Sequence, residues 1–257
     1  MNLSFVIIWG RKQVKRKLGY VADFCPVCRT ITPHQVSRVG MAGHLYYIPF
    51  GQGDLIGYHG TCCKCGLLTN ANPDRHTTVA PKLNPNLDDL IRTTTPDIYQ
   101  RYAQRLEIEL DLQRSLSWVS DDLRSALIEE PFDLIAPLAE SPKRLIFDRK
   151  TMIALGILLG TAWFISPILV AMLPHQTELP LLLTLCAFGY FFFELLLRAE
   201  HKQMNQEWIP MLATALKPLN PTIDELWGQL SRLSIAHRRL GRKVKPDTLK
   251  AAIDRQS

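Results

Sequence analysis

The chain has 257 residues, of which 47% are hydrophobic, and its 30 Lys and Arg against 24 Asp and Glu give a net charge of +6. This length allows more than one folding unit, and the composition excludes a wholly disordered chain and a strongly polar secreted scaffold. The charge is unevenly distributed, because residues 1–73 carry 8 basic and 2 acidic side chains, whereas residues 151–197 contain no Lys or Arg. A stretch of this length without basic residues favours a membrane protein.

The first 73 residues have the pattern of a small antiparallel sheet. The apolar run from Phe5 to Trp9 predicts a short β-strand, and the region from Gly10 to Lys12 predicts a turn. Two β-prone runs, 44–50 and 55–59, flank a glycine-containing tetrapeptide that is typical of a hairpin loop. Residues 74–87 are rich in Pro, Asn and Thr, so we expect a linker there.

Two Cys-x-x-Cys pairs, separated by 33 residues, lie within this segment. A Cys-x-x-Cys turn places two sulfurs on one side of a tight loop, and four thiolates form the ligand set of a closed, tetrahedral zinc site. The spacing therefore predicts one structural Zn²⁺ bound by Cys25, Cys28, Cys62 and Cys65. Gly66 would take a positive φ beside the second pair. Arg29 and Lys64 are placed to offset the negative charge of four thiolates, or are simply solvated.

These motifs resemble those of the zinc-ribbon 15 family. The similar stretches are residues 5–10, the Cys-Pro-Val-Cys pair, residues 46–49 and the Cys-Cys-Lys-Cys-Gly pair, which together cover about residues 3–70. The resemblance implies a zinc-ribbon fold and one structural zinc on the four cysteines. It implies no activity, because the family is largely uncharacterised.

Helical patterns follow in residues 88–142, which are acidic. Thr95 and Pro96 predict the start of an amphipathic helix of roughly twenty residues, with apolar residues recurring every four positions from Ile98. A second helix is expected from Ser120 to about Glu130, and a third, short one after Pro131. Their acidic faces would be solvated or would dock against the basic N-terminal segment.

Residues 151–173 and 179–197 are two long apolar runs, and Glu194 is the one charged residue within them. At 1.5 Å per residue each run is long enough to cross a hydrocarbon core about 30 Å thick as a helix. Basic residues flank the pair on both sides and are absent from the link, which predicts a transmembrane hairpin with both termini cytosolic. The alternative is a pair of buried helices in a globular core. Gly156 and Gly160 form a GxxxG motif through which such helices could form a homo-oligomer.

The remaining residues, 198–257, predict a basic helical segment. Thr222 and Glu225 match a capping box that opens a helix to about Leu240, with Gly241 as its stop, and Pro246 opens a last short helix. The end of this segment is densely basic. We expect contact with anionic lipid or nucleic acid, or a solvated helix end, at Arg238, Arg239, Arg242, Lys243 and Lys245.

Other interpretations of the cysteines are two disulfides or a redox dithiol. A cytosolic location disfavours disulfides, and a thioredoxin-like pair would need a βαβ context that this segment lacks. Cys63 is interpreted as a small buried residue or as a substitute for a neighbouring ligand. His34, His44 and His59 could bind metal, but four thiolates already complete the set.

Together these patterns predict an α+β multidomain membrane protein with an N-terminal antiparallel β zinc ribbon, helical cytosolic segments and a two-helix transmembrane hairpin. The motifs HExxH, GxSxG and GxxxxGK[ST] are missing, so we expect no catalytic residues and no enzyme activity. The leading hypothesis is a zinc-binding scaffold in the inner membrane, in contact with the bilayer and another protein. The alternatives are a membrane-tethered nucleic-acid-binding ribbon, which the scarcity of aromatics in the basic runs disfavours, and a subunit of a membrane enzyme complex.

Overall fold

A computed structural model of the chain describes residues 9–46, 48–114, 120–140, 204–236 and 238–256, together with a few single positions between 153 and 193. The chain divides into two units. The first contains residues 1–131, 214–221 and 256–257, and the second contains residues 132–213 and 222–255.

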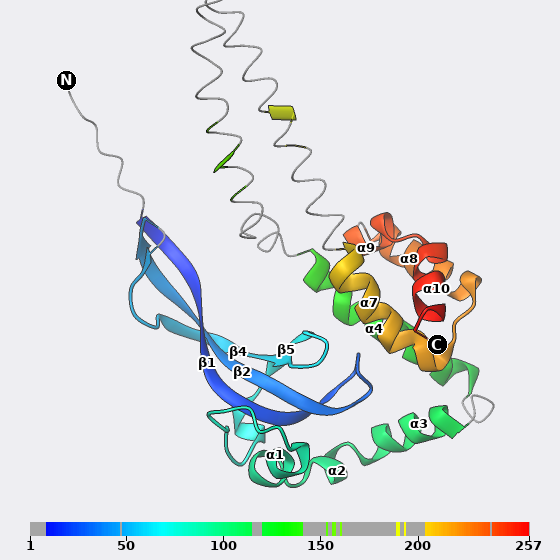
Figure 1. Ribbon diagram of the computed structural model, residues 1–257, viewed down its shortest axis with the longest axis horizontal. Helices are drawn as coiled ribbons and strands as arrows, with labels where there is room; N and C mark the ends of the chain where they lie inside the picture. The colour runs from blue at the N-terminus through cyan, green and yellow to red at the C-terminus, as the bar shows by residue number, and fades with distance from the viewer. Residues whose placement is uncertain are drawn as a thin grey trace, which may run out of the picture. The chain divides into compact units, whose positions relative to one another are not determined.

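The first unit is built on one antiparallel sheet (Figure 1). The strands run in the order β1-β2-β4-β5, and β3 pairs with β2 at one end. Their bounds are β1 (Trp9–Cys25), β2 (Thr30–Leu45), β3 (Ile48–Pro49), β4 (Asp54–Cys62) and β5 (Leu68–Ala71). The antiparallel sheet expected from the sequence is therefore confirmed.

β1 is much longer than the short strand that the sequence predicts, and it pairs with β2 from Trp9↔Leu45 to Cys25↔Thr30. The predicted turn from Gly10 to Lys12 is wrong, because those residues continue the strand. The first half of β1 is largely exposed, so charged side chains can occupy it while their heads stay in water. The second half is buried, with Val21 and Ala22 almost inaccessible to solvent. Of the predicted strand at residues 5–9, only Trp9 lies among the described residues.

Three short helices pack on the buried half of β1. They are α1 (Leu87–Thr94), α2 (Ile98–Arg101) and α3 (Ala103–Arg114), and a 3₁₀ turn, η1 (Pro73–Arg75), precedes them. Ala22 and Ile31 of the sheet share a core with Leu90, Ile91 and Ile98 of the helices. Helices follow Thr95 as the sequence predicts, but they begin at Ile98, because Thr95 caps the end of α1, and the structure divides them at Tyr102. All of α1 except Leu87 lies within the predicted helical segment 88–142, although the sequence indicated no separate helix there.

The outer edge of β1 is closed by side chains and by the predicted linker. The Ala22 N–H donates to Thr94 Oγ1, and Thr95 Oγ1 donates to the Ala22 carbonyl, each over 3.0 Å. Tyr20 and Ala80 exchange two backbone hydrogen bonds of 2.7 and 2.9 Å. An uncovered strand edge would leave these groups open to another chain. Part of the expected linker therefore protects the sheet.

The remaining helices are also short, apart from α4 (Asp121–Ala139), which is one helix where the sequence predicts two. The others are a π-helical turn η4 (Met204–Trp208), α7 (Ile209–Leu216), a 3₁₀ turn η5 (Lys217–Leu219), α8 (Ile223–Ile235), α9 (Arg239–Lys243) and α10 (Pro246–Asp254). The capping box at the start of α8 is confirmed, since the Thr222 side chain accepts from Glu225 N and the Glu225 carboxylate accepts from Thr222 N.

Gly241 does not end the helix that starts at Thr222, as the sequence predicts; α8 ends earlier, and Gly241 lies inside α9. A Cβ at Gly241 would collide with the backbone nitrogen of Ser234 and would lie 2.5 Å from the carbonyl oxygen of Leu230. Glycine is therefore required because α9 packs directly on the backbone of α8.

Two alanine substitutions in the second unit test this packing. Gly241→Ala should lower the free energy of unfolding by about 1–3 kcal/mol, because the backbone of α8 has to move away. Gly228→Ala should raise it by about 0.5–1 kcal/mol, because Gly228 is exposed within α8 and no atom lies within 4 Å of its Cβ position. Urea denaturation of both variants measures the difference, and a shift of the same sign in both would contradict the packing.

The predicted transmembrane hairpin is contradicted. No helix in the described ranges is long and apolar enough to cross a membrane. The two predicted spans, 151–173 and 179–197, lie outside the described residues except at single positions. The prediction rested on runs of apolar residues, and such a run becomes a span only as one continuous helix of about twenty residues.

The fold class is therefore corrected to an antiparallel sheet that carries a four-cysteine cluster, together with helices. The predictions of a multi-pass protein of the inner membrane and of cytosolic termini depended on the hairpin and are withdrawn with it. Contact with a lipid bilayer stays a prediction. The predicted homo-oligomer through Gly156 and Gly160 depended on the same hairpin.

Candidate metal centre

The two Cys-x-x-Cys pairs lie at the same end of the sheet. Cys25 ends β1 and Cys28 lies in the turn before β2, whereas Cys62 ends β4 and Cys65 lies in the turn before β5. Because β2 and β4 are antiparallel neighbours, with His34 paired to Cys62, the turn before β2 and the turn after β4 meet. The strand order thus brings together sulfurs that are about 40 residues apart in the sequence.

The two turns have the same backbone geometry. In the first, the Arg29 N–H donates to the Cys25 carbonyl over 2.7 Å, and in the second the Gly66 N–H donates to the Cys62 carbonyl over 2.9 Å. The residue after each second cysteine has a positive φ, 56° at Arg29 and 78° at Gly66. The expectation for Gly66 is confirmed. A non-glycine residue in this conformation costs roughly 1–2 kcal/mol, so Arg29 needs a compensating contact.

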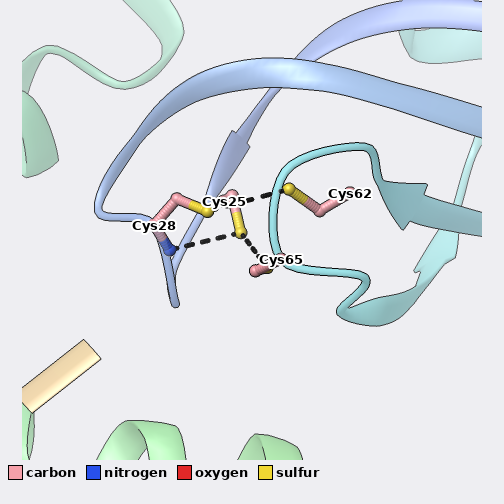
Figure 2. Close-up of side chains that lie close together, drawn as sticks. All are labelled: Cys25, Cys28, Cys62 and Cys65. Carbon is pink, nitrogen blue, oxygen red and sulfur yellow. Dashed lines mark hydrogen bonds between the residues drawn. The ribbon is translucent and has the colours of Figure 1, made fainter. Parts of the chain in front are cut away.

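The four sulfurs converge on one point (Figure 2). The Sγ atoms of Cys25 and Cys65 are 3.5 Å apart, those of Cys28 and Cys62 are 3.8 Å apart, and all four lie within 4.8 Å of one another. With Zn–S bonds of about 2.3 Å, a tetrahedron places its sulfurs about 3.8 Å apart. The four cysteines are therefore positioned to bind a metal ion, and the spacing suits zinc.

Neighbouring groups favour thiolate at Cys62 and the protonated thiol at Cys25. Thr32 Oγ1 lies 3.3 Å from Cys62 Sγ, and the Cys28 N–H donates to Cys25 Sγ over 3.4 Å. Hydrogen bonds from the Cys25 and Cys28 thiols lower the pKa of Cys62 below its ordinary range. The contact with Cys28 raises the pKa of Cys25 in turn. Four sulfurs at this distance cannot all carry charge unless a cation joins them.

Arg29 connects the first turn to α3 through a buried ion pair. Its Nε donates to Glu109 Oε2 over 2.6 Å, and the two side chains are only 5% and 6% exposed. Its Nη1 donates to the Ala215 carbonyl over 3.1 Å. Glu109 also accepts from Arg105 Nε over 2.9 Å, and Arg105 Nη2 reaches Glu130 over 2.6 Å. This network is the contact that offsets the unfavourable backbone of Arg29.

The other predicted site residues lie elsewhere. Cys63 is exposed and lies outside the group of four sulfurs, and the side chain of Lys64 is solvated. The Nδ1 of buried His34 lies 3.0 Å from the Thr32 carbonyl, and neither His44 nor His59 joins the cluster. Burial lowers the pKa of His59 and Lys15 lowers it further, so its imidazole is neutral at pH 7. The five cysteines of the described segments are free rather than paired in disulfides.

The basic residues of the tail are distributed over α9 and the start of α10. Arg238 precedes α9, Lys245 precedes α10, and both are exposed together with Arg242 and Lys243, whereas Arg239 is half-buried. Their contact with lipid or nucleic acid stays a prediction.

Sequence reasoning missed Glu109. It lies within the acidic helical pattern, 80 residues from Arg29, and nothing local distinguishes it from its exposed neighbours such as Glu107. One signal in the sequence was available: Arg29 follows the first Cys-x-x-Cys pair at the position that glycine occupies after the second pair, which indicates that its side chain has a partner.

Comparison with known proteins places the chain in no family. No family model matches it, and no curated protein and no solved structure is significantly similar to it.

Removal of the Glu109 charge tests the network. Glu109→Gln leaves the Arg29 guanidinium buried without a carboxylate, which should cost about 3 kcal/mol locally. Amide hydrogen exchange in α3 and around Arg29 should therefore become on the order of 100-fold faster. Glu107→Gln makes the same change at an exposed position of α3 and should alter exchange little. Equal exchange in the two variants would show that the ion pair does not hold α3.

Proposed function

We propose that the chain is a non-enzymatic zinc-binding protein in which a single structural Zn²⁺ holds the N-terminal sheet as a zinc ribbon. The convergence of four cysteine sulfurs from two matching turns is the observation that carries the proposal. The resemblance to the zinc-ribbon 15 family over residues 3–70 supports the same interpretation, although no family model matches.

A bound zinc ion would supply the bond between the two turns. The residues of the chain do the rest: Cys25 and Cys28 bind from the β1–β2 turn, and Cys62 and Cys65 bind from the β4–β5 turn. Thr32 orients the Cys62 sulfur through its hydroxyl. Because four thiolates leave no position for water or substrate, this centre suits structure rather than catalysis.

The ribbon would then serve as a binding module. The buried half of the sheet is occupied by α1, α2 and α3, whereas the opposite end of the β1–β2 hairpin projects exposed basic and apolar side chains. A rigid sheet that is fixed at one end by metal presents the other end in a defined conformation. Exposed apolar patches rimmed by polar residues mark interaction sites, so we expect this end to contact a partner.

Two neighbouring cysteines provide a matched test in the full-length protein, purified under reducing conditions. Cys62→Ser removes a buried sulfur of the cluster, whereas Cys63→Ser removes an exposed one. The wild type and Cys63→Ser should each contain one zinc per chain, and Cys62→Ser should contain little or none. Because metal binding contributes on the order of 10 kcal/mol to the folding of small zinc modules, Cys62→Ser should also become protease-sensitive between residues 9 and 71.

Elemental analysis and limited proteolysis measure both results. If the reduced wild type contains no zinc, or if Cys63→Ser loses the metal while Cys62→Ser retains it, the proposed site is wrong.

A further inference from the structure

The end of the sheet opposite the metal centre combines basic and aromatic side chains on one face. No register shift occurs between Trp9 and Lys17, so Trp9, Arg11 and Lys15 project from the same side of β1. All three are exposed, and Trp9 is 81% exposed. With a rise of about 3.4 Å per residue, this face extends about 20 Å from Trp9 to Lys15.

The strand pairing adds apolar side chains to this face. Leu45 pairs with Trp9 and Ile48 pairs with Leu45, while Phe50 donates its N–H to the carbonyl of Gly43, the residue that pairs with Arg11. Ile48 and Phe50 are 66% and 62% exposed. The pairing thus places Phe50 on the same face as Trp9 and Arg11, with Gly43 between Arg11 and Phe50.

The face is also open. No atom lies within 4 Å of the position that a Cβ would occupy at Gly43, which lies between Arg11 and Phe50. A flat ligand can therefore approach the backbone of the sheet between the aromatic and basic side chains.

The charge of the surrounding segment selects the ligand. Between Trp9 and Asp74 the sequence contains eight Lys and Arg but only two carboxylates, Asp23 and Asp54. Asp54 pairs with Met41 on this face, and the positive charge of β1 outweighs it. The same positive charge would repel a second copy of this surface and attracts a polyanion.

We propose that this face binds single-stranded nucleic acid, with bases stacked on Trp9 and Phe50 and phosphates paired with Arg11 and Lys15. Single-strand binding characteristically combines a basic track with exposed aromatic rings, because every base has a face that can stack. Trp9 lies next to the basic run in the sequence, and the strand pairing adds Phe50 to the same face. The inference rests on the proposed function, because the metal centre holds the same β-strands.

Fluorescence anisotropy with a labelled twelve-nucleotide oligouridylate tests this surface in the full-length, zinc-loaded protein. Trp9→Ala should weaken binding about tenfold, the effect of removing one stacking side chain. Trp227→Ala is the matched control, because Trp227 is 63% exposed on α8 in the other unit, and it should leave binding unchanged. The double variant Arg11→Ala, Lys15→Ala should reduce the slope of log affinity against log salt by about 1.4, or about 0.7 for each lost phosphate contact.

The outcomes separate this inference from the proposed function because zinc is measured in the same samples. Absent binding in a protein that contains one zinc overturns the nucleic-acid surface and leaves the structural zinc intact. The nucleic-acid surface would also be overturned if Trp9→Ala and Trp227→Ala changed the affinity for the oligouridylate equally. The same conclusion would follow if the protein bound a duplex as tightly as the single strand, or if it formed a dimer that Trp9→Ala abolished. A wild type without zinc overturns the proposed function, whereas specific weakening by Trp9→Ala would still support the surface.

Discussion

The convergence of four cysteine sulfurs is the constraint on which the first unit depends. The sheet has only two places where its chain turns tightly at this end, and each turn contributes two sulfurs. Without a cation the charged forms of these thiols oppose one another, and with a cation they link the β1–β2 turn to the β4–β5 turn. The β1–β2 hairpin is long and one half of it is exposed, so it buries little core of its own. A metal link between its turn and the β4–β5 turn would therefore hold the hairpin in one orientation.

The same turn carries the connection to the helices. Arg29 occupies a backbone conformation that Gly66 adopts without cost in the other turn, and it holds this conformation while its side chain pairs with buried Glu109. Such a pair is costly to break, because either partner alone would be a buried charge. The packing of α3 and the geometry of the first cysteine turn are therefore coupled. Loss of the metal should therefore loosen the packing of α3, and disruption of α3 should disturb the geometry of the first cysteine turn.

Local patterns predicted the two Cys-x-x-Cys turns and the capping box at Thr222, because each depends on residues close together in the sequence. The repeated Cys-x-x-Cys spacing then indicated that the two distant turns meet at one site. The full length of β1 could not be predicted, since basic residues that favour a turn are equally stable on an exposed strand. The single helix α4 was missed because Pro131 was interpreted as a boundary, although both its neighbouring apolar residues, Ile128 and Phe132, are buried. The ion pair between Arg29 and Glu109 depends on tertiary packing alone. The transmembrane hairpin was inferred from apolar composition, and no helix among the described residues is long and apolar enough to cross a membrane.

X-ray absorption at the zinc edge of the purified, reduced protein tests the central claim most directly, because it reports the atoms bonded to the metal. The account predicts a first shell of four sulfurs at about 2.3 Å, with no nitrogen or oxygen. A first shell that contains nitrogen or oxygen would contradict it, because the four cysteines would then not be the complete ligand set.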